Sequence, residues 1–199
     1  MQERGAVETL NAAGDDRPVA TGELIAGEAR RRARRIRVML VVALVVVTAD
    51  QVTKSLAVSR LSSGPVHLIG PFALVLAYNT GVSFSVGTGL TLPIILIVVV
   101  VVAVLAYFGR AVPNTAAAVG VGMILGGAVG NLSDRLFRGH HGAVVDFLRS
   151  GFWPTFNLAD SAIVCGCVVL AIALWRTSAT TKAPVAGERS EQAGRGPLL

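Results

Sequence analysis

The stretch that decides the fold class is Ile94–Leu105, IILIVVVVVAVL, which contains only isoleucine, leucine, valine and alanine. It forms the centre of a longer apolar run at about residues 90–108. A helix needs about 20 predominantly apolar residues to cross the hydrocarbon core of a bilayer. The run therefore predicts a membrane-spanning helix.

Three further apolar runs of similar length lie at about residues 38–58, 112–132 and 152–175. Hydrophobic residues make up 53% of the chain and charged residues 15%, whereas a soluble domain carries about 25% charged residues. The run at 112–132 is rich in glycine and alanine, which suits close packing between membrane helices. We therefore expect an all-α membrane protein with four transmembrane helices.

Two polar tails flank this core. Residues 1–35 and 177–199 lack apolar periodicity and are predicted to be disordered cytoplasmic tails, which leaves residues 36–176 as the transmembrane domain. An arginine-rich segment directly before the first apolar run indicates a cytoplasmic N-terminus, and four spans return the C-terminus to the same side. The arginines of this segment are Arg30, Arg31, Arg32, Arg34, Arg35 and Arg37. We interpret them as a topology signal and expect no nucleic-acid partner. A cleaved signal peptide is disfavoured, because it would begin near the N-terminus.

The two longer connections, at about residues 59–89 and 133–151, would then lie on the outer side of the membrane. Residues 65–78 alternate turn-forming residues with short apolar runs such as Phe72–Leu76. This alternation is typical of short strands or of an amphipathic segment. We expect a small extracytoplasmic, β-like flap on the membrane surface.

Acidic residues are rare in the predicted membrane domain. Between residues 36 and 176 the chain has only four, all aspartates: Asp50, Asp134, Asp146 and Asp160. An ionised carboxylate inside a membrane costs at least a few kcal/mol, so such residues usually have a function. The expected topology brings all four to the outer side of the membrane. Their common depth predicts one shared site.

Two of the four aspartates have a cation close in sequence. Lys54 follows Asp50 by one helical turn, so the two side chains can form an ion pair. Arg135 follows Asp134 directly and is a candidate bidentate partner of that carboxylate. Asp50 and Asp134 are therefore predicted to support the site rather than to react.

The other two aspartates, Asp146 and Asp160, have apolar neighbours and no adjacent cation. An apolar environment raises the pKa of a carboxyl group. Two close carboxylates that share one proton are the working parts of an aspartic protease. We expect this pair to carry the chemistry.

A short pattern occurs twice, as Asn131-Leu-Ser-Asp134 and Asn157-Leu-Ala-Asp160. Each places an amide and a carboxylate on one helical face. The asparagine can orient the carboxylate by donating a hydrogen bond. Alternatively, these residues cap helix ends, and the pattern leaves both interpretations open.

The sequence offers two alternative interpretations, a metal site and a transporter. His140 and His141 together with Asp146 could bind a metal ion, but the chain has no HExxH motif. A small proton-coupled transporter could use intramembrane carboxylates as relays. Such transporters usually show inverted repeats and carboxylates near the bilayer midplane, and this chain shows neither pattern.

Five sequence blocks follow one another in the order DQVTK (50–54), NTGVSF (79–84), GGAVGNLSDR (126–135), VDF (145–147) and FNLADSAI (156–163). In this order they resemble the lipoprotein signal peptidase (signal peptidase II) family, the aspartic peptidases of bacterial membranes. The stretch between the third and fourth blocks is longer than is usual in the family.

The resemblance implies four transmembrane helices and a site near the extracytoplasmic face of the bacterial cytoplasmic membrane. It places the catalytic pair of an aspartic endopeptidase on Asp146 and Asp160. The supporting and substrate-binding residues that it implies are Asp50, Lys54, Asn79, Asn131, Asp134, Arg135 and Asn157. The implied substrates are lipid-modified prolipoproteins, which are cleaved before a diacylglyceryl-modified cysteine among the membrane lipids. No metal ion or organic cofactor is implied.

Overall fold

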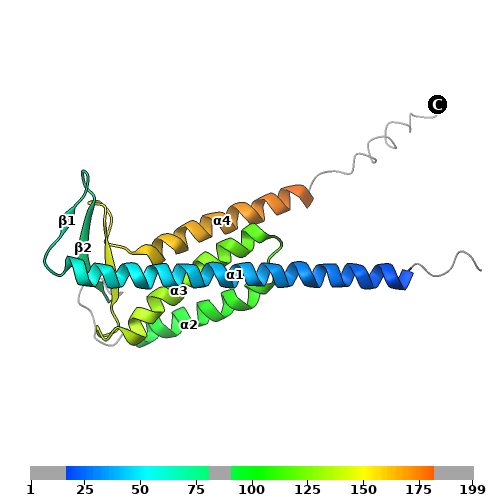
Figure 1. The fold of residues 1–199 in the computed structure, drawn as a ribbon, viewed down its shortest axis with the longest axis horizontal. Coiled ribbons are helices and arrows are strands. Elements are labelled where there is room, and N and C mark those ends of the chain that lie inside the picture. The colour runs from blue at the N-terminus through cyan, green and yellow to red at the C-terminus, as the bar shows by residue number, and fades with distance from the viewer. Residues whose placement is uncertain (1–16, 81–90, 182–199) are drawn as a thin grey trace, which may run out of the picture. The chain divides into compact units, whose positions relative to one another are not determined.

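The structure, a computed structural model, describes residues 17–80 and 91–181 (Figure 1). The chain divides into two compact units, Met1–Arg34 and Arg35–Leu199, and all of the elements discussed below, apart from the start of the first helix, belong to the second unit. In chain order the elements are α1 (Arg17–Leu61), β1 (Val66–His67), β2 (Ala73–Asn79), α2 (Thr91–Phe108), the short 3₁₀ helix η1 (Gly109–Ala111), α3 (Thr115–Phe137), β3 (Val144–Arg149) and α4 (Leu158–Thr181).

Within the described part of the chain, four helices are long and apolar enough to cross a membrane, which confirms the predicted fold class. Their candidate spans are Gly22–Leu61, Leu92–Ala111, Thr115–Phe137 and Leu158–Ala179. The span in α2 is the most apolar, with a mean hydropathy of 3.0, because it contains the aliphatic run Ile94–Leu105. Most of its side chains point outward, as expected for a surface that faces lipid.

The first helix begins earlier than the sequence predicted. The sequence predicts a disordered tail that includes residues 17–35, but these residues are helical in α1. Alanine and arginine, which are frequent there, have high helix propensity and need no apolar periodicity to form a helix. The last helix likewise extends into the predicted C-terminal tail, to Thr181. The remainder of both tails lies outside the described residues.

The most buried of the four spans is in α3, where glycines let the neighbouring helices approach closely. A Cβ atom on Gly126 would lie 2.7 Å from the carbonyl oxygen of Ala43 in α1. A Cβ atom on Gly127 would collide with the carbonyl oxygen of Ala159 in α4. Since these contacts are with backbone atoms, only glycine fits at both positions. The close approach brings polar residues of α1, α3 and α4 within reach of one another.

A three-stranded antiparallel sheet in the order β1-β2-β3 forms the predicted flap. The first two strands come from residues 66–79, as expected. The third strand, β3, comes from the second outer connection, where no strand was predicted. In the register of β2 and β3, Ala77 lies opposite Asp146 and Tyr78 opposite Val145. The sheet therefore fixes the backbone position of one of the four aspartates.

Candidate active site

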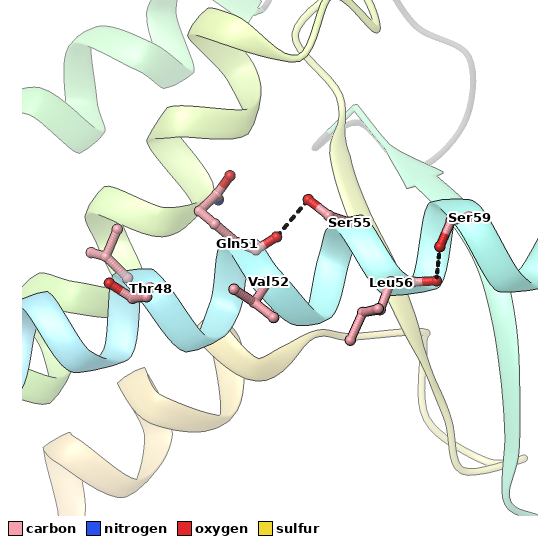
Figure 2. Close-up of a pocket in the computed structure, with 7 residues that line it drawn as sticks. Thr48, Gln51, Val52, Ser55, Leu56 and Ser59 are labelled. Carbon is pink, nitrogen blue, oxygen red and sulfur yellow. Dashed lines mark hydrogen bonds between the residues drawn. The ribbon is translucent and has the colours of Figure 1, made fainter.

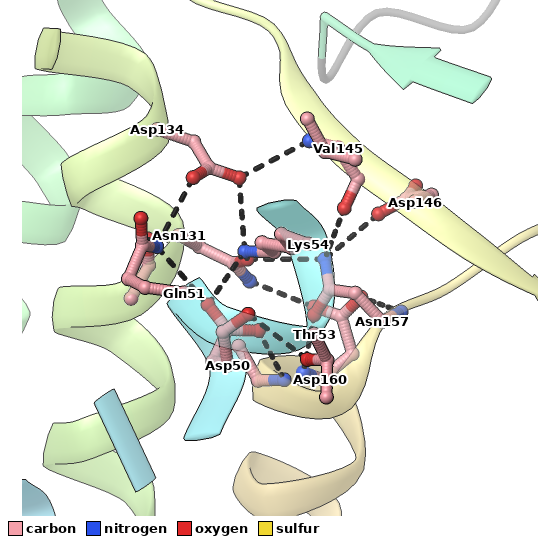
Figure 3. Close-up of polar contacts among 12 residues, drawn as sticks. Asp50, Gln51, Thr53, Lys54, Asn131, Asp134, Val145, Asp146, Asn157 and Asp160 are labelled. Atoms are coloured by element: carbon pink, nitrogen blue, oxygen red, sulfur yellow. Dashed lines mark hydrogen bonds and ion pairs between the residues drawn. The ribbon is translucent and has the colours of Figure 1, made fainter. Parts of the chain in front are cut away.

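Lys54 lies at the centre of a buried ion-pair cluster (Figure 3). Its Nζ is 2.8 Å from Asp50 Oδ2 and 2.9 Å from Asp134 Oδ2, and all three side chains are fully buried. The first pair spans one helical turn of α1, as the sequence predicted. The second joins α1 to α3. One ammonium group thus interacts with two carboxylates from different helices.

Each of these two carboxylates also accepts a backbone hydrogen bond. Asp50 Oδ1 accepts from the N–H of Ala159 at 3.0 Å, and Asp134 Oδ2 accepts from the N–H of Val145 at 3.1 Å. Ala159 and Val145 directly precede the other two aspartates in the sequence. Asp50 and Asp134 therefore hold the backbone immediately before Asp160 and Asp146.

The arginine partner of Asp134 is not the one predicted. Asp134 Oδ1 lies 2.7 Å from Nε of Arg138, the C-cap residue of α3. No ion pair joins Asp134 to Arg135 in the described residues. Adjacent residues of a helix point in different directions, whereas residues four apart share a face. Arg135 instead donates from Nη1 to the carbonyl oxygen of Asn131 at 3.3 Å, and its buried Nε has no hydrogen-bond partner among the described residues.

Gln51 and Arg138 belong to the cluster, although neither was predicted as a site residue from the sequence. Gln51 Nε2 donates to Asp134 Oδ1 at 3.1 Å and to the carbonyl oxygen of Gly130 at 3.0 Å. Arg138 Nη2 donates to Gln51 Oε1 at 3.1 Å. The spacing of Asp134 and Arg138 was a usable signal, since it equals that of Asp50 and Lys54. For Gln51, the only signal was its place inside a block shared with the family.

Asp146 lies in β3 and is almost completely buried, with 1% of its surface exposed. Asn79 Nδ2 donates to its Oδ2 at 3.0 Å, and Asn157 Nδ2 donates to its Oδ1 at 2.8 Å. Burial raises the pKa of Asp146 above its ordinary value, the two amide donors oppose this effect, and the nearby charge of Asp160 adds to it. The carboxyl group therefore keeps its proton to a higher pH than a solvated aspartate does.

Asp160 lies in the first turn of α4, where Asn157 caps the helix. Asn157 Oδ1 accepts from the backbone N–H of Asp160 at 3.0 Å, and Asp160 Oδ2 accepts from the backbone N–H of Asn157 at 3.1 Å. This reciprocal arrangement satisfies two amides at the helix N-terminus. The sequence left open whether Asn157 orients a carboxylate or caps a helix. The structure shows the cap, and the side-chain Nδ2 of Asn157 also donates to Asp146.

Asn131 connects the ion-pair cluster with the other two aspartates. Its Nδ2 donates to Asp160 Oδ1 at 2.8 Å, and its Oδ1 accepts from Lys54 Nζ at 2.8 Å and from Asn157 Nδ2 at 3.1 Å. The structure shows no hydrogen bond from its side chain to Asp134, three residues later in α3. The amide of Asn131 therefore orients the aspartate of the neighbouring helix rather than that of its own.

The predicted site residues come together in the structure. The three ion pairs of the described residues involve Asp50 and Asp134, whereas Asp146 and Asp160 have no cation within ion-pair distance there. Exposure distinguishes these last two, because Asp160 is partly exposed. Within the described residues, the arrangement offers one cluster in which two cations pair with two carboxylates. It also offers one pair of carboxyl groups whose hydrogen-bond donors there are all amides. Such a pair can share a proton and exchange it with a bound molecule.

A separate groove runs along the surface of α1 (Figure 2). Its polar lining consists of Thr48, Gln51, Ser55 and Ser59, and no aspartate contributes to it. It is therefore distinct from the paired carboxyl groups. Within residues 17–80 and 91–181, no group of three or more histidine, cysteine, aspartate or glutamate side chains is arranged to hold a metal ion.

Comparison with known proteins gives a consistent result. The sequence profile of the family described as Signal peptidase (SPase) II matches residues 42–176. A lipoprotein signal peptidase of Mycobacterium tuberculosis is 47% identical over 144 residues, which cover 70% of this chain and 71% of the relative. That of Mycobacterium avium is 46% identical over 147 residues, which cover 71% of this chain and 81% of the relative.

Two solved structures of bacterial membrane enzymes have a similar fold. One superposes with a TM-score of 0.61 at 27% sequence identity and covers 68% of this chain and 91% of its own. The other has a TM-score of 0.62 at 25% identity and covers 74% of this chain and 93% of its own. The profile spans more than half of the chain, including all four aspartates. The chain therefore belongs to the signal peptidase II family of membrane peptidases.

Proposed function

We propose that this protein is an aspartic endopeptidase in which Asp146 and Asp160 hydrolyse the peptide bond between a signal peptide and a lipoprotein. Membership of the family supports the removal of signal peptides from prolipoproteins. The observation that carries the assignment of residues is the contrast between the two pairs. Lys54 pairs with both Asp50 and Asp134, and Arg138 also pairs with Asp134. Within the described residues, the hydrogen bonds to Asp146 and Asp160 all come from amide groups.

In the proposed reaction, ionised Asp160 removes a proton from a water molecule as the water oxygen attacks the scissile carbonyl carbon. Protonated Asp146 donates a hydrogen bond to the carbonyl oxygen and stabilises the charge that develops there. When the C–N bond breaks, Asp160 passes the proton that it took from water to the leaving amine, and the products are a carboxylate and an amine. The proposed hydrolysis thus uses two carboxyl groups and one water molecule.

The different environments of the two carboxyl groups support this division of roles. Asp146 is buried and its pKa is raised, so it is the better holder of the shared proton. Asp160 is partly exposed, so water can reach it. These roles describe the protonation state in which the pair would react.

We further propose that the substrate cysteine carries a diacylglyceryl group and that cleavage occurs directly before it. The exposed aliphatic surfaces of α2 and α4 would face bilayer lipid and can accommodate acyl chains. In the proposed orientation, both termini are in the cytoplasm and the sheet lies at the outer face of the cytoplasmic membrane. The signal peptide then reaches the carboxyl groups laterally from the bilayer. A peptidase family match gives no support to the transporter that the sequence left as an alternative.

The test is cleavage of a purified diacylglyceryl-modified prolipoprotein by the full-length protein in lipid–detergent micelles, read by mass spectrometry of both products. Asp146→Asn and Asp160→Asn should each abolish cleavage, since each removes a proton carrier. Asp16→Asn makes the same chemical change outside the residues matched by the family and should leave the rate unchanged. Wild-type turnover in either Asp146→Asn or Asp160→Asn would refute the assignment of these two residues. Cleavage at another bond would refute only the proposed position.

A further inference from the structure

Arg138 lies outside the five sequence blocks shared with the family. Its side chain connects the end of α3 to α1 through hydrogen bonds. Its Nε donates to Asp134 Oδ1 at 2.7 Å. Its Nη2 donates to Gln51 Oε1 at 3.1 Å, to the carbonyl oxygen of Gln51 at 3.2 Å and to Ser55 Oγ at 3.2 Å. A planar guanidinium group presents these donors in a fixed geometry. Arg138 therefore constrains both the helix packing and the Asp134 carboxylate.

The two oxygens of Asp134 have different partners. Oδ1 accepts from Arg138 and Gln51, whereas Oδ2 accepts from Lys54 and from the backbone N–H of Val145. A carboxylate is planar and rigid, so fixing the position of Oδ1 also fixes the direction of Oδ2. The hydrogen bond to Val145 thus depends on the groups that hold the opposite oxygen.

Val145 directly precedes Asp146 in β3, and the carbonyl oxygen of Val145 also accepts from Asn157 Nδ2 at 3.4 Å. A displacement of this backbone would change the position of Asp146 relative to its donors, Asn79 and Asn157. Misplacement of a reacting group by about 1 Å can reduce a catalytic rate by roughly 100-fold. Small movements at this point of β3 are therefore expected to change turnover.

We propose that Arg138 is a positioning residue for the reaction, which acts through Asp134 and the Val145 N–H to set the place of Asp146. The proposal rests on the catalytic role proposed above for Asp146 and Asp160. Lys54 carries a single positive charge, which Asp50 and Asp134 share, so Arg138 also supplies the second positive charge of the cluster. The comparison with Arg138→Lys separates this charge from the directional hydrogen bonds of the guanidinium group. The Arg138 side chain is 19% exposed, so solvent screens part of its charge, and its directional hydrogen bonds matter more.

The test compares Arg138→Gln and Arg138→Lys with the wild-type full chain in the micelle cleavage assay. Arg138→Gln should lower kcat roughly tenfold and leave KM within about twofold, because Arg138 contacts Asp134 and α1 rather than the paired carboxyl groups. Arg138→Lys should give an intermediate kcat, since lysine restores the charge but not the planar fork. Arg149→Gln removes an exposed arginine of β3 and should leave both constants unchanged.

Two results would overturn the proposal. One is a kcat of folded Arg138→Gln within about twofold of wild type, and the other is a loss confined to KM. If Arg138→Gln does not fold, Arg138→Lys decides: a roughly threefold loss of kcat supports the role and an unchanged kcat refutes it. Asp160→Asn is measured in parallel. Its activity would refute the proposed function itself, whereas its inactivity beside unaffected Arg138 variants would refute only the positioning role.

Discussion

Asp50 Oδ1 in α1 accepts a hydrogen bond of 3.0 Å from the backbone N–H of Ala159, the residue before Asp160 in α4. Asp134 forms the equivalent bond to the residue before Asp146. Both bonds end at carboxylates that share the ammonium group of Lys54. The buried ion pairs therefore connect the two segments that present the proposed catalytic carboxyl groups. Disturbing the cluster should affect stability and catalysis together.

Replacing Lys54 with methionine should destabilise the protein severely. The change leaves Asp50 without its cation in a buried site, and such a loss costs about 3–5 kcal/mol. Adding Asp50→Asn should restore part of the stability, because Asp134 then retains Arg138 as its partner. Thermal unfolding in detergent micelles measures both effects. Lys182→Met, outside the residues matched by the family, is the control. Equal unfolding temperatures for Lys54→Met and wild type would contradict the importance of the ion pairs.

The two tasks of Asn157 can be separated by substitution. Its Oδ1 caps α4, and its Nδ2 donates to Asp146. Asn157→Ala should lose both, with a cost of about 1 kcal/mol in stability from the missing cap. Asn157→Ser should keep the cap, since serine is an equally good capping residue, but its hydroxyl is too short to replace the amide donor.

Both variants should therefore lose most of their cleavage activity, while only Asn157→Ala should also unfold at a lower temperature. Unfolding curves and single-turnover cleavage rates, measured on the same preparations, distinguish the two effects. A serine variant with a wild-type rate would show that the bond to Asp146 does not contribute to catalysis.

The sequence predicted the four spans and the ion pair between Asp50 and Lys54, because both depend on local information. A run of aliphatic residues determines a span by its length, and Lys54 reaches Asp50 within one helical turn. The pairing of Asn131 with Asp160 was not predictable, since it depends on how α3 packs against α4. The same holds for β3, whose strand conformation comes from pairing with β2.

The error over Arg135 has a different origin. Adjacency in sequence suggested a pair with Asp134, although helix geometry favours Arg138 four residues later. That choice required knowing that α3 continues to Phe137. The predicted span ends at residue 132, so Asp134, Arg135 and Arg138 all fall in the predicted outer connection, where no helical spacing was expected.

Gly126 should not tolerate alanine. A Cβ atom there would lie 2.7 Å from both the carbonyl oxygen of Ala43 and Cβ of Val46 in α1. Overpacking of this kind costs about 1–3 kcal/mol, so Gly126→Ala should unfold at a lower temperature. Gly27 is the matched control, because it is helical and a Cβ atom there meets nothing within 4 Å. Since alanine favours helix more than glycine does, Gly27→Ala should be neutral or slightly stabilising. Equal losses in both variants would refute close α1–α3 packing at this position.

The alkaline limb of the activity profile should report the proton of Asp146. Its pKa is raised above the ordinary 3.8 by burial, while the hydrogen bond from Asn79 lowers it. The protonated form is present below the raised pKa and is lost as pH rises through it, so cleavage should decline on that side. Asn79→Ala removes a donor that favours the ionised form. It should therefore move the alkaline limb to higher pH, in addition to reducing the maximal rate.

The measurement is kcat against pH for wild type, Asn79→Ala and His67→Ala, the last of which changes an exposed residue of β1 and should leave the limb in place. Each limb is fitted with one apparent pKa, whose absolute value does not by itself identify the titrating group. The direction of its movement is nevertheless decisive, since losing a donor to a carboxylate can only favour the protonated form. A limb that stays fixed or moves to lower pH in Asn79→Ala would assign the essential proton to a group other than Asp146.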